Sequence, residues 1–129
     1  MTIIRHYPGQ IDYAVAYRDM QAFNHGRTPA TADEIWCLQH PPVYTLGMAG
    51  KHEHILVPGR IPVVQTDRGG QVTYHGPGQL VVYLMLDLKR LGLGIRRYVW
   101  CLEQAVMDTL TVFSLAAERK EKAPGVYVQ

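Results

Sequence analysis

Two stretches of the chain repeat apolar residues every three or four positions, one near each end. The first stripe consists of Tyr13, Ala16, Tyr17, Met20 and Phe23. The second consists of Val99, Leu102, Val106, Leu110 and Phe113. This spacing places each set on one face of an α-helix, and Gly26 is a typical residue to end the first helix. We therefore predict two amphipathic helices, the second packed against a sheet.

Short β-prone runs lie before, between and after the two predicted helices. They predict strands at residues 3–7, 34–39, 43–46, 61–65, 71–74, 80–88 and 125–128. Residues 47–55 and the charged stretch 114–124 are expected to be connections. This order of elements favours an α+β fold with a mixed sheet and flanking helices, rather than a regular βαβ series.

Three of the runs carry a more specific expectation. Pro41 and Pro42 cannot donate hydrogen bonds to a sheet ladder, so residues 43–46 are expected to form an edge strand. Residues 61–65 and 71–74 flank a short polar segment with two glycines and are expected to pair as a hairpin. Residues 80–88 are almost all apolar, which is typical of a strand buried on both faces at the centre of a sheet.

Composition excludes several classes of protein. The 129 residues are 47% hydrophobic and 19% charged, which is ordinary for a single soluble domain. A net charge of +2 and a pI near 8.6 are too mild to indicate a nucleic-acid binder. The longest apolar run falls short of the roughly 18 residues of a membrane span, and no secretory leader precedes the first strand. Cys37 and Cys101 belong to no Cys-x-x-Cys pair, so we expect a cytoplasmic protein without disulfides, membrane or nucleic acid.

Residues 67–79 crowd glycines and hydrogen-bonding side chains between two β-prone runs. Glycine permits a positive φ and a close approach of backbone to ligand, and consecutive N–H groups in such turns can bind an oxygen. Arg68 could anchor a carbonyl or carboxylate, while Thr73, Tyr74 and His75 offer hydroxyl and imidazole groups. The alternative is that the glycines form ordinary tight turns, with Arg68 and His75 in solvent.

The unbroken run at residues 68–83, RGGQVTYHGPGQLVVY, resembles the signature of lipoyl(octanoyl) transferases. Similar family features occur at residues 33–36, 40–45, 50–51 and 123–128, so the resemblance spans almost the whole chain. It implies a fold similar to the biotin and lipoate protein ligases, with a mixed sheet and flanking helices around an acyl-binding tunnel. Residues 1–129 would form the N-terminal part of a single octanoyltransferase catalytic domain.

The resemblance also implies which residues line the substrate site. They are Arg68, Gly69, Gly70, Gln71, Val72, Thr73, Tyr74 and His75. The family's nucleophilic cysteine and its helper lysine follow the strand matched by residues 125–128, so no catalytic residue, cofactor or metal is expected in this chain. Cys37 and Cys101 are expected to be packed small apolar side chains. The chain by itself is therefore expected to be a fragment without activity.

The implied reaction moves an octanoyl group from acyl carrier protein to a lysine of lipoyl domains, those of 2-oxo acid dehydrogenases and of the glycine cleavage H protein. We expect the acyl chain beside residues 80–88, with its carbonyl near the Gly69-Gly70 turn. A basic cluster contains Lys89, Arg90, Arg96 and Arg97, and it is either a solvated face or a docking surface for the acidic carrier. Two rival functions stay open. One is an ATP-dependent lipoate or biotin ligase, and the other is a catalytically dead acyl-binding module.

Two further motifs carry weaker signals. His52, Glu53 and His54 lack a third histidine or cysteine at metal-site spacing and are expected to form a solvated loop. His40, before two prolines, is expected to be a turn or packing residue rather than a base.

Overall fold

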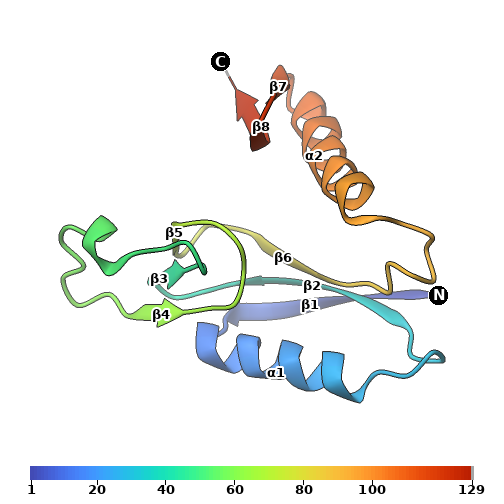
Figure 1. Ribbon diagram of the computed structural model, residues 1–129, viewed down its shortest axis with the longest axis horizontal. Coiled ribbons are helices and arrows are strands. Elements are labelled where there is room, and N and C mark those ends of the chain that lie inside the picture. Colours follow the sequence, from blue (N-terminus) through green and yellow to red (C-terminus); the bar gives the residue numbers. More distant parts are fainter. Residues whose placement is uncertain (129) are drawn as a thin grey trace. The chain divides into compact units, whose positions relative to one another are not determined.

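The computed structural model describes residues 1–128 and divides the chain into two compact units, Met1–Leu86 and Asp87–Gln129. The first unit contains β1 (Thr2–Gln10), α1 (Tyr13–Gly26), β2 (Asp33–Gln39), β3 (Val43–Leu46), the 3-10 turn η1 (His52–His54), β4 (Val63–Gln65), β5 (Val72–His75) and β6 (Val81–Met85). The second contains α2 (Ile95–Val112), β7 (Ala117–Lys120) and β8 (Ala123–Val128) (Figure 1). The predicted α+β class is confirmed.

One three-stranded sheet carries α1 on one face (Figure 1). Its order is β1-β2-β6, with β1 parallel and β6 antiparallel to the central strand β2. α1 begins at Tyr13 because the Asp12 carboxylate accepts the backbone N–H groups of Ala14 and Val15, at 2.9 and 3.3 Å. The core of this layer consists of Met20, Trp36, Met85, Tyr7, Tyr17, Phe23 and Tyr83. The first predicted helix and its apolar face are confirmed.

Two consecutive acidic residues at the start of β2 are buried, each with a cationic partner. Arg27 donates to Asp33 at 2.7 Å, and Arg5 donates to Glu34 at 2.6 Å. The indole N–H of Trp36 also donates to Glu34, at 2.7 Å. The hydrogen bond from Arg5 holds the pKa of Glu34 below its ordinary value. These contacts tie β1 and the segment after α1 to the central strand.

A second three-stranded sheet has the order β4-β3-β5, which corrects two expectations. Residues 61–65 and 71–74 do not pair as a hairpin, because β3 lies between β4 and β5. For the same reason β3 is a central strand and not an edge strand. The two prolines end before Val43, so they remove no hydrogen bond from the ladder. Thr45 and Leu46 are completely buried, and β4 and β5 pair with the two edges of their strand.

β6 also differs from its prediction, since it lies at an edge of its sheet and β2 occupies the centre. Met85 packs in the core, but Val82 is 46% exposed and Leu80, outside the strand, is 68% exposed. An apolar run indicates which faces of a strand can be buried, but it does not indicate how many strands pair with it. The prediction of a central strand at residues 80–88 was wrong for this reason.

The second unit is a helix against a hairpin. The stretch 114–124, expected to be a connection, contains β7, which pairs antiparallel with β8. Arg119 of β7 donates to Glu103 at 3.0 Å and to Gln104 at 2.9 Å, and Glu103 accepts the backbone N–H of Gly125 at 2.9 Å. These side chains fasten α2 to both strands. Among the described residues, neither helix is long and apolar enough to cross a bilayer.

Candidate functional site

Two glycine-containing loops of the first unit pack directly on each other. We call residues 47–50, which follow β3, and residues 67–71, which precede β5, the paired loops. The backbone N–H groups of Gly47, Met48 and Ala49 donate to the carbonyls of Gln71 (3.0 Å), Arg68 (2.9 Å) and Gly70 (3.3 Å). Three successive N–H groups are thereby used to hold the second loop in place.

The close approach of the paired loops depends on glycine. A β-carbon on Gly47 would lie 2.7 Å from the Gly69 carbonyl oxygen and 2.9 Å from the Arg68 guanidinium, and closer still to the Gly70 oxygen. Gly70 has φ +86°, a left-handed conformation that side chains with a β-carbon rarely adopt. The sequence signalled Gly69-Gly70, but the need for glycine at position 47 arises only from the contact between loops.

Arg68 holds these loops from inside. Its guanidinium donates to the backbone carbonyl and the hydroxyl of Thr45, both at 2.8 Å, to the Gln71 carbonyl at 3.0 Å and to the Gly69 carbonyl at 2.9 Å. The guanidinium of Arg68 therefore binds backbone and side-chain oxygens of the protein itself. The idea that Arg68 anchors a substrate carbonyl stays a prediction, and a structural role that the sequence did not indicate is now visible.

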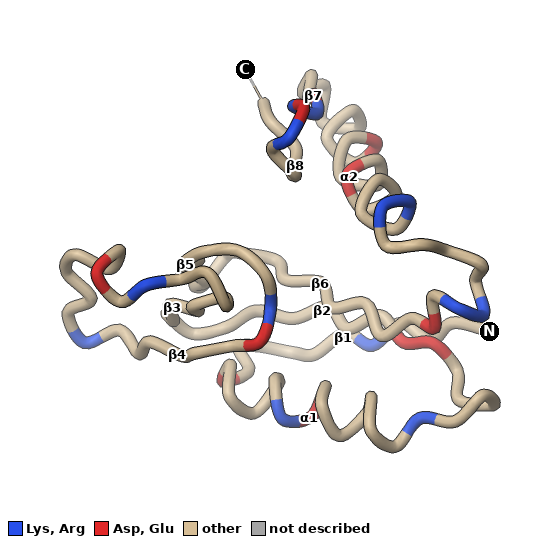
Figure 2. Tube along the Cα trace, viewed as in Figure 1, with Lys and Arg blue, Asp and Glu red and all other residues tan. Residues whose placement is uncertain are grey.

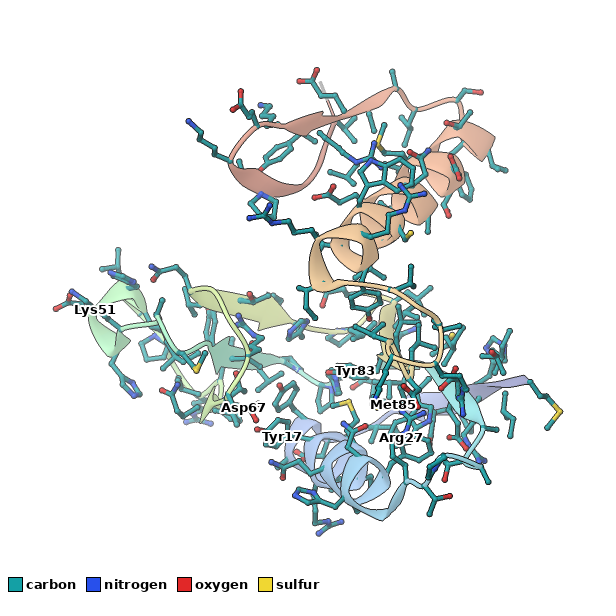
Figure 3. The ribbon with its side chains drawn as sticks, turned by 45° about the vertical axis from the view of Figure 1, so that its right-hand side comes forward. Tyr17, Arg27, Lys51, Asp67, Tyr83 and Met85 are labelled. Atoms are coloured by element: carbon teal, nitrogen blue, oxygen red, sulfur yellow. The ribbon has the colours of Figure 1, made fainter. Side chains whose placement is uncertain are left out.

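α1 reaches the same loops through Asp67. Tyr17 of α1 and Asp67 form a side-chain hydrogen bond, which is the main reason that the pKa of Tyr17 is raised. Figure 3 shows the two side chains meeting between the helix and the loop. The helix that builds the core thus also fixes the residue next to Arg68.

His75, at the end of β5, lies in a cluster of aromatic rings. Its ring stacks on Tyr13 with centroids 6.2 Å apart and planes 9° apart, and meets His40 edge-on at 5.9 Å. His75 Nδ1 is 2.7 Å from the Gln79 side-chain oxygen. The His40 ring is completely buried and lies 2.8 Å from the Tyr83 hydroxyl. The expectation that His40 packs inside the fold is confirmed.

Burial sets the charge state of this cluster. It lowers the pKa of His40 and raises the pKa values of Tyr13 and Tyr83, so all three are neutral at pH 7. The positive charge of Arg68 acts against burial at both tyrosines. The paired loops approach this part of the fold through Arg68, which donates to Thr45 of β3, the strand that pairs with β5.

The eight predicted site residues do not share one surface. Arg68, Gly69, Gly70 and Gln71 belong to the paired loops, whereas the other four alternate between the two faces of β5. His75 faces the ring cluster. Tyr74, on the opposite face, is 45% exposed and packs its ring 5.5 Å from that of Tyr44. The structure therefore places His75 and Tyr74 on opposite faces of β5, and His75 at the end of the strand away from the paired loops.

Two cavities of the chain lie elsewhere. A cavity of about 530 Å³ lies in the first unit and is lined by Asp12, Tyr13, Ala14, Pro41, Pro42, Val43, Arg60, Ile61, Pro62 and Val64. A second of about 220 Å³ lies in the second unit beside Ala116, Ala117, Glu118 and Tyr127. Neither of these two is lined by a residue between 68 and 75. The acyl tunnel beside residues 80–88 stays a prediction.

Candidate nucleophiles and metal ligands in the described part of the chain are dispersed. Cys37 in β2 and Cys101 in α2 are both half-buried free thiols. His52 and His54 are exposed in η1, and His54 Nδ1 lies 2.9 Å from the Gln71 side chain. Within residues 1–128, no group of three or more histidine, cysteine, aspartate or glutamate side chains is placed to hold a metal ion.

Comparison with known protein families and curated proteins gives consistent matches. The lipoyl protein ligase A/B catalytic domain matches residues 12–129. An octanoyltransferase of Xanthomonas axonopodis pv. citri is 62% identical over 120 residues, which are 93% of this chain and 52% of that protein. An octanoyltransferase of Albidiferax ferrireducens is 57% identical over all 129 residues, 56% of its length. The chain spans about half the length of the curated relatives it matches.

Solved structures show the same fold. A putative lipoate protein ligase from T. acidophilum superposes with a TM-score of 0.67 at 16% identity, covering 98% of this chain and 56% of that one. A bi-partite lipoate protein ligase from Thermoplasma acidophilum, described with its E2 lipoyl domain, gives 0.63 at 18% identity and covers 93% and 48%. At this identity the likeness shows the fold alone, and it confirms the expected similarity to lipoate protein ligases.

Proposed function

Because the chain belongs to the lipoyl protein ligase A/B catalytic domain family, we propose that it is part of an octanoyltransferase of lipoate biosynthesis. The donor in this proposal is octanoyl-acyl carrier protein, and the acceptor is a lysine of a lipoyl domain. The observation that carries the proposal is the unbroken run at residues 68–83, in a chain 57–62% identical to proteins named octanoyltransferase.

The paired loops suit an acyl thioester. Their glycines bring backbone, rather than side chains, to the surface beside Gly69 and Gly70, which are both exposed. We place the thioester carbonyl there. Each methylene of an octanoyl chain that is buried contributes about 0.8 kcal/mol, so an apolar channel can hold the chain without any charge at its tail.

In the proposed reaction, a cysteine thiolate attacks the thioester carbonyl and the carbon–sulfur bond to the carrier breaks. The lysine amine of the acceptor then attacks the new thioester, loses a proton and releases the thiolate. Family resemblance assigns this cysteine and its helper lysine to positions beyond residue 128, and neither Cys37 nor Cys101 matches. The residues of this chain bind and orient the acyl group.

The test of function uses the full-length gene product with octanoyl-acyl carrier protein and a lipoyl domain. We expect the mass of the lipoyl domain to rise by one octanoyl group without ATP. A requirement for ATP and free octanoate would favour the ligase. Binding of the carrier-bound acyl group without transfer would favour the dead acyl-binding module.

Gly70 provides a second test of the acyl site. A leucine at this position would combine a strained φ with a side chain at the proposed carbonyl position, so we expect Gly70→Leu to lose transfer. Gly94→Ala is the matched control, because position 94 has an extended backbone and open space around its β-carbon. Full activity of Gly70→Leu would show that the thioester carbonyl does not bind at this position.

The two cysteines allow a direct test of where the thioester forms. After incubation of residues 1–129 with octanoyl-carrier protein, we expect no hydroxylamine-sensitive octanoyl group on Cys37 or Cys101. An octanoyl thioester on either residue, lost in the corresponding Cys→Ser variant, would overturn the expectation that the nucleophile lies elsewhere.

The basic cluster of the second unit is the proposed docking surface for the carrier. Lys89 and Arg90 lie in the turns before α2, and Arg96 and Arg97 in its first turn, as Figure 2 shows in blue. Cations at a helix N-terminus oppose the helix dipole, at a cost of about 0.3–1 kcal/mol each. No acidic residue in the first turn of α2 balances these charges, and Arg97 lies over the ring of Trp100 at 4.1 Å.

Charge reversal tests this surface. We expect the double variant Arg96→Glu, Arg97→Glu to weaken carrier binding at low salt and to reduce its salt dependence. Arg18→Glu, on the exposed side of α1, is the control. If the double variant bound the carrier as tightly as the wild type and with the same salt dependence, the basic cluster would be a solvated face and not a docking surface.

A further inference from the structure

His40 is the most deeply buried titratable residue beside the proposed site, and both of its ring nitrogens are in use. Nδ1 lies 2.7 Å from the backbone carbonyl oxygen of Ile11, and Nε2 lies 2.8 Å from the hydroxyl of Tyr83. A carbonyl can only accept, so Nδ1 carries the proton. Nε2 of the neutral ring then accepts the hydrogen bond from Tyr83.

These two bonds fix the plane of the His40 ring. Ile11 precedes α1, and Tyr83 belongs to β6, so the ring joins the start of the helix to the edge strand of its sheet. Burial keeps both partners neutral, because it lowers the pKa of His40 and raises that of Tyr83. His40 and Tyr83 therefore form a hydrogen-bonded, uncharged pair at pH 7, which we call the His40–Tyr83 pair.

The His40–Tyr83 pair contacts His75 through the ring of His40. The His40 ring meets the His75 ring edge-on at 5.9 Å, while Tyr13 stacks on His75 at 6.2 Å and meets His40 at 5.2 Å. Gln79 accepts from His75 Nδ1 at 2.7 Å. Two rings and one hydrogen bond therefore define the orientation of His75, and Nε2 is left as its acceptor nitrogen.

An apolar residue could fill the volume of His40 without having to satisfy two polar atoms in the core. Val43 and Thr45 of β3 pair with His75 and Thr73 of β5, and Arg68 of the paired loops donates to Thr45 at 2.8 Å. His75, which the His40 ring contacts, therefore belongs to the same pair of strands that Arg68 contacts. A role for the polar pair at the site follows from that position.

We propose that His40 is a positioning residue, which together with Tyr83 holds His75 in a single orientation so that Nε2 of His75 is presented to the acyl-thioester site as a hydrogen-bond acceptor. The proposal rests on the proposed function for the substrate that His75 meets. The orientation of His75 itself does not depend on that function.

The test is the pair of variants Tyr83→Phe and Tyr7→Phe in the full-length gene product. Each removes one hydroxyl from a tyrosine of the same core layer, but only Tyr83 contacts His40. Tyr7 packs on Trp36, with ring centroids 5.7 Å apart, and serves as the matched control. Tyr83→Phe keeps the ring, so it avoids the loss of folding that a truncation of His40 would cause.

The first readout is nitrogen NMR of the histidine rings. We expect the wild type to show His40 protonated on Nδ1 only, and we expect Tyr83→Phe to shift the ring resonances of His75. Tyr7→Phe should leave them unchanged. The same His75 resonances in the two variants would overturn the proposal.

The second readout is octanoyl transfer. We expect kcat/KM to fall about fivefold to tenfold in Tyr83→Phe, the net effect of one hydrogen bond, with most of the loss in kcat. Unchanged transfer in Tyr83→Phe would also overturn the proposal. If the wild type transfers nothing but the NMR difference persists, the proposed function fails and the positioning of His75 stands.

Discussion

Replacement of Gly47 by alanine is the most direct test of the paired loops. The new β-carbon would lie 2.7 Å from the Gly69 oxygen and 2.9 Å from the Arg68 guanidinium, and nearer to the Gly70 oxygen. Backbone atoms cannot rotate away, so the loops must separate. Overpacking of this kind costs about 1–3 kcal/mol. Weakening of the hydrogen bond from Gly47 to Gln71 adds about 1 kcal/mol, which gives about 2–4 kcal/mol in total.

The assay is equilibrium unfolding in urea, followed by the fluorescence of the core. With a slope of about 2 kcal/mol per molar urea, the midpoint of Gly47→Ala should fall by about 1–2 M. Gly69→Ala is the control, because its β-carbon would meet nothing within 4 Å and its φ is not left-handed. That variant should stay within about 0.5 kcal/mol of the wild type. Equal midpoints for the two variants would refute the close packing of the loops.

Two further predictions concern the buried charges and His40. Arg27→Leu should destabilise the fold by about 3 kcal/mol in urea unfolding, because it removes an ion-pair partner of the buried Asp33. Arg18→Leu, at an exposed ion pair, should cost less than about 0.5 kcal/mol. Equal losses of stability in the two variants would contradict this difference. Burial holds the pKa of folded His40 below its unfolded value, so the unfolded state binds the proton first and stability should fall as the pH drops below about 6.5. His40→Gln should flatten that fall between pH 7 and 5, and an unchanged slope in His40→Gln would show that another group is responsible.

The sequence predicted local structure better than pairing. Both helices and most strands were confirmed, because hydrophobic period and capping residues act over a few positions. The second apolar stripe was confirmed only in part, since Val106 is 48% exposed and Phe113 lies beyond the end of α2. The order β4-β3-β5 was not foreseen, because it depends on which distant strand offers a buried edge. Residues 80–88 show the same limit, since their apolar character was equally compatible with an edge strand covered by α1.

The candidate site divides in the same way. The motif identified residues 68–75, and the alternation of β5 then separated Tyr74 from His75. Contacts of Arg68 with Thr45, and of His40 with Tyr83, join positions 23 and 43 residues apart and left no local signal. Only the fold shows that a core histidine and a motif histidine are neighbours.

The central position of β3 has a consequence for how the first unit acquires its shape. Both of its neighbours, β4 and β5, follow it in the chain, and the loop that Gly47 contacts is more than twenty residues away. Closing such long intervals costs chain entropy before any contact compensates for it, which slows folding. During synthesis, β3 has no partner until β4 has emerged, and its second edge stays unpaired until residue 75 has emerged. A growing chain is most open to strand-to-strand aggregation in that interval.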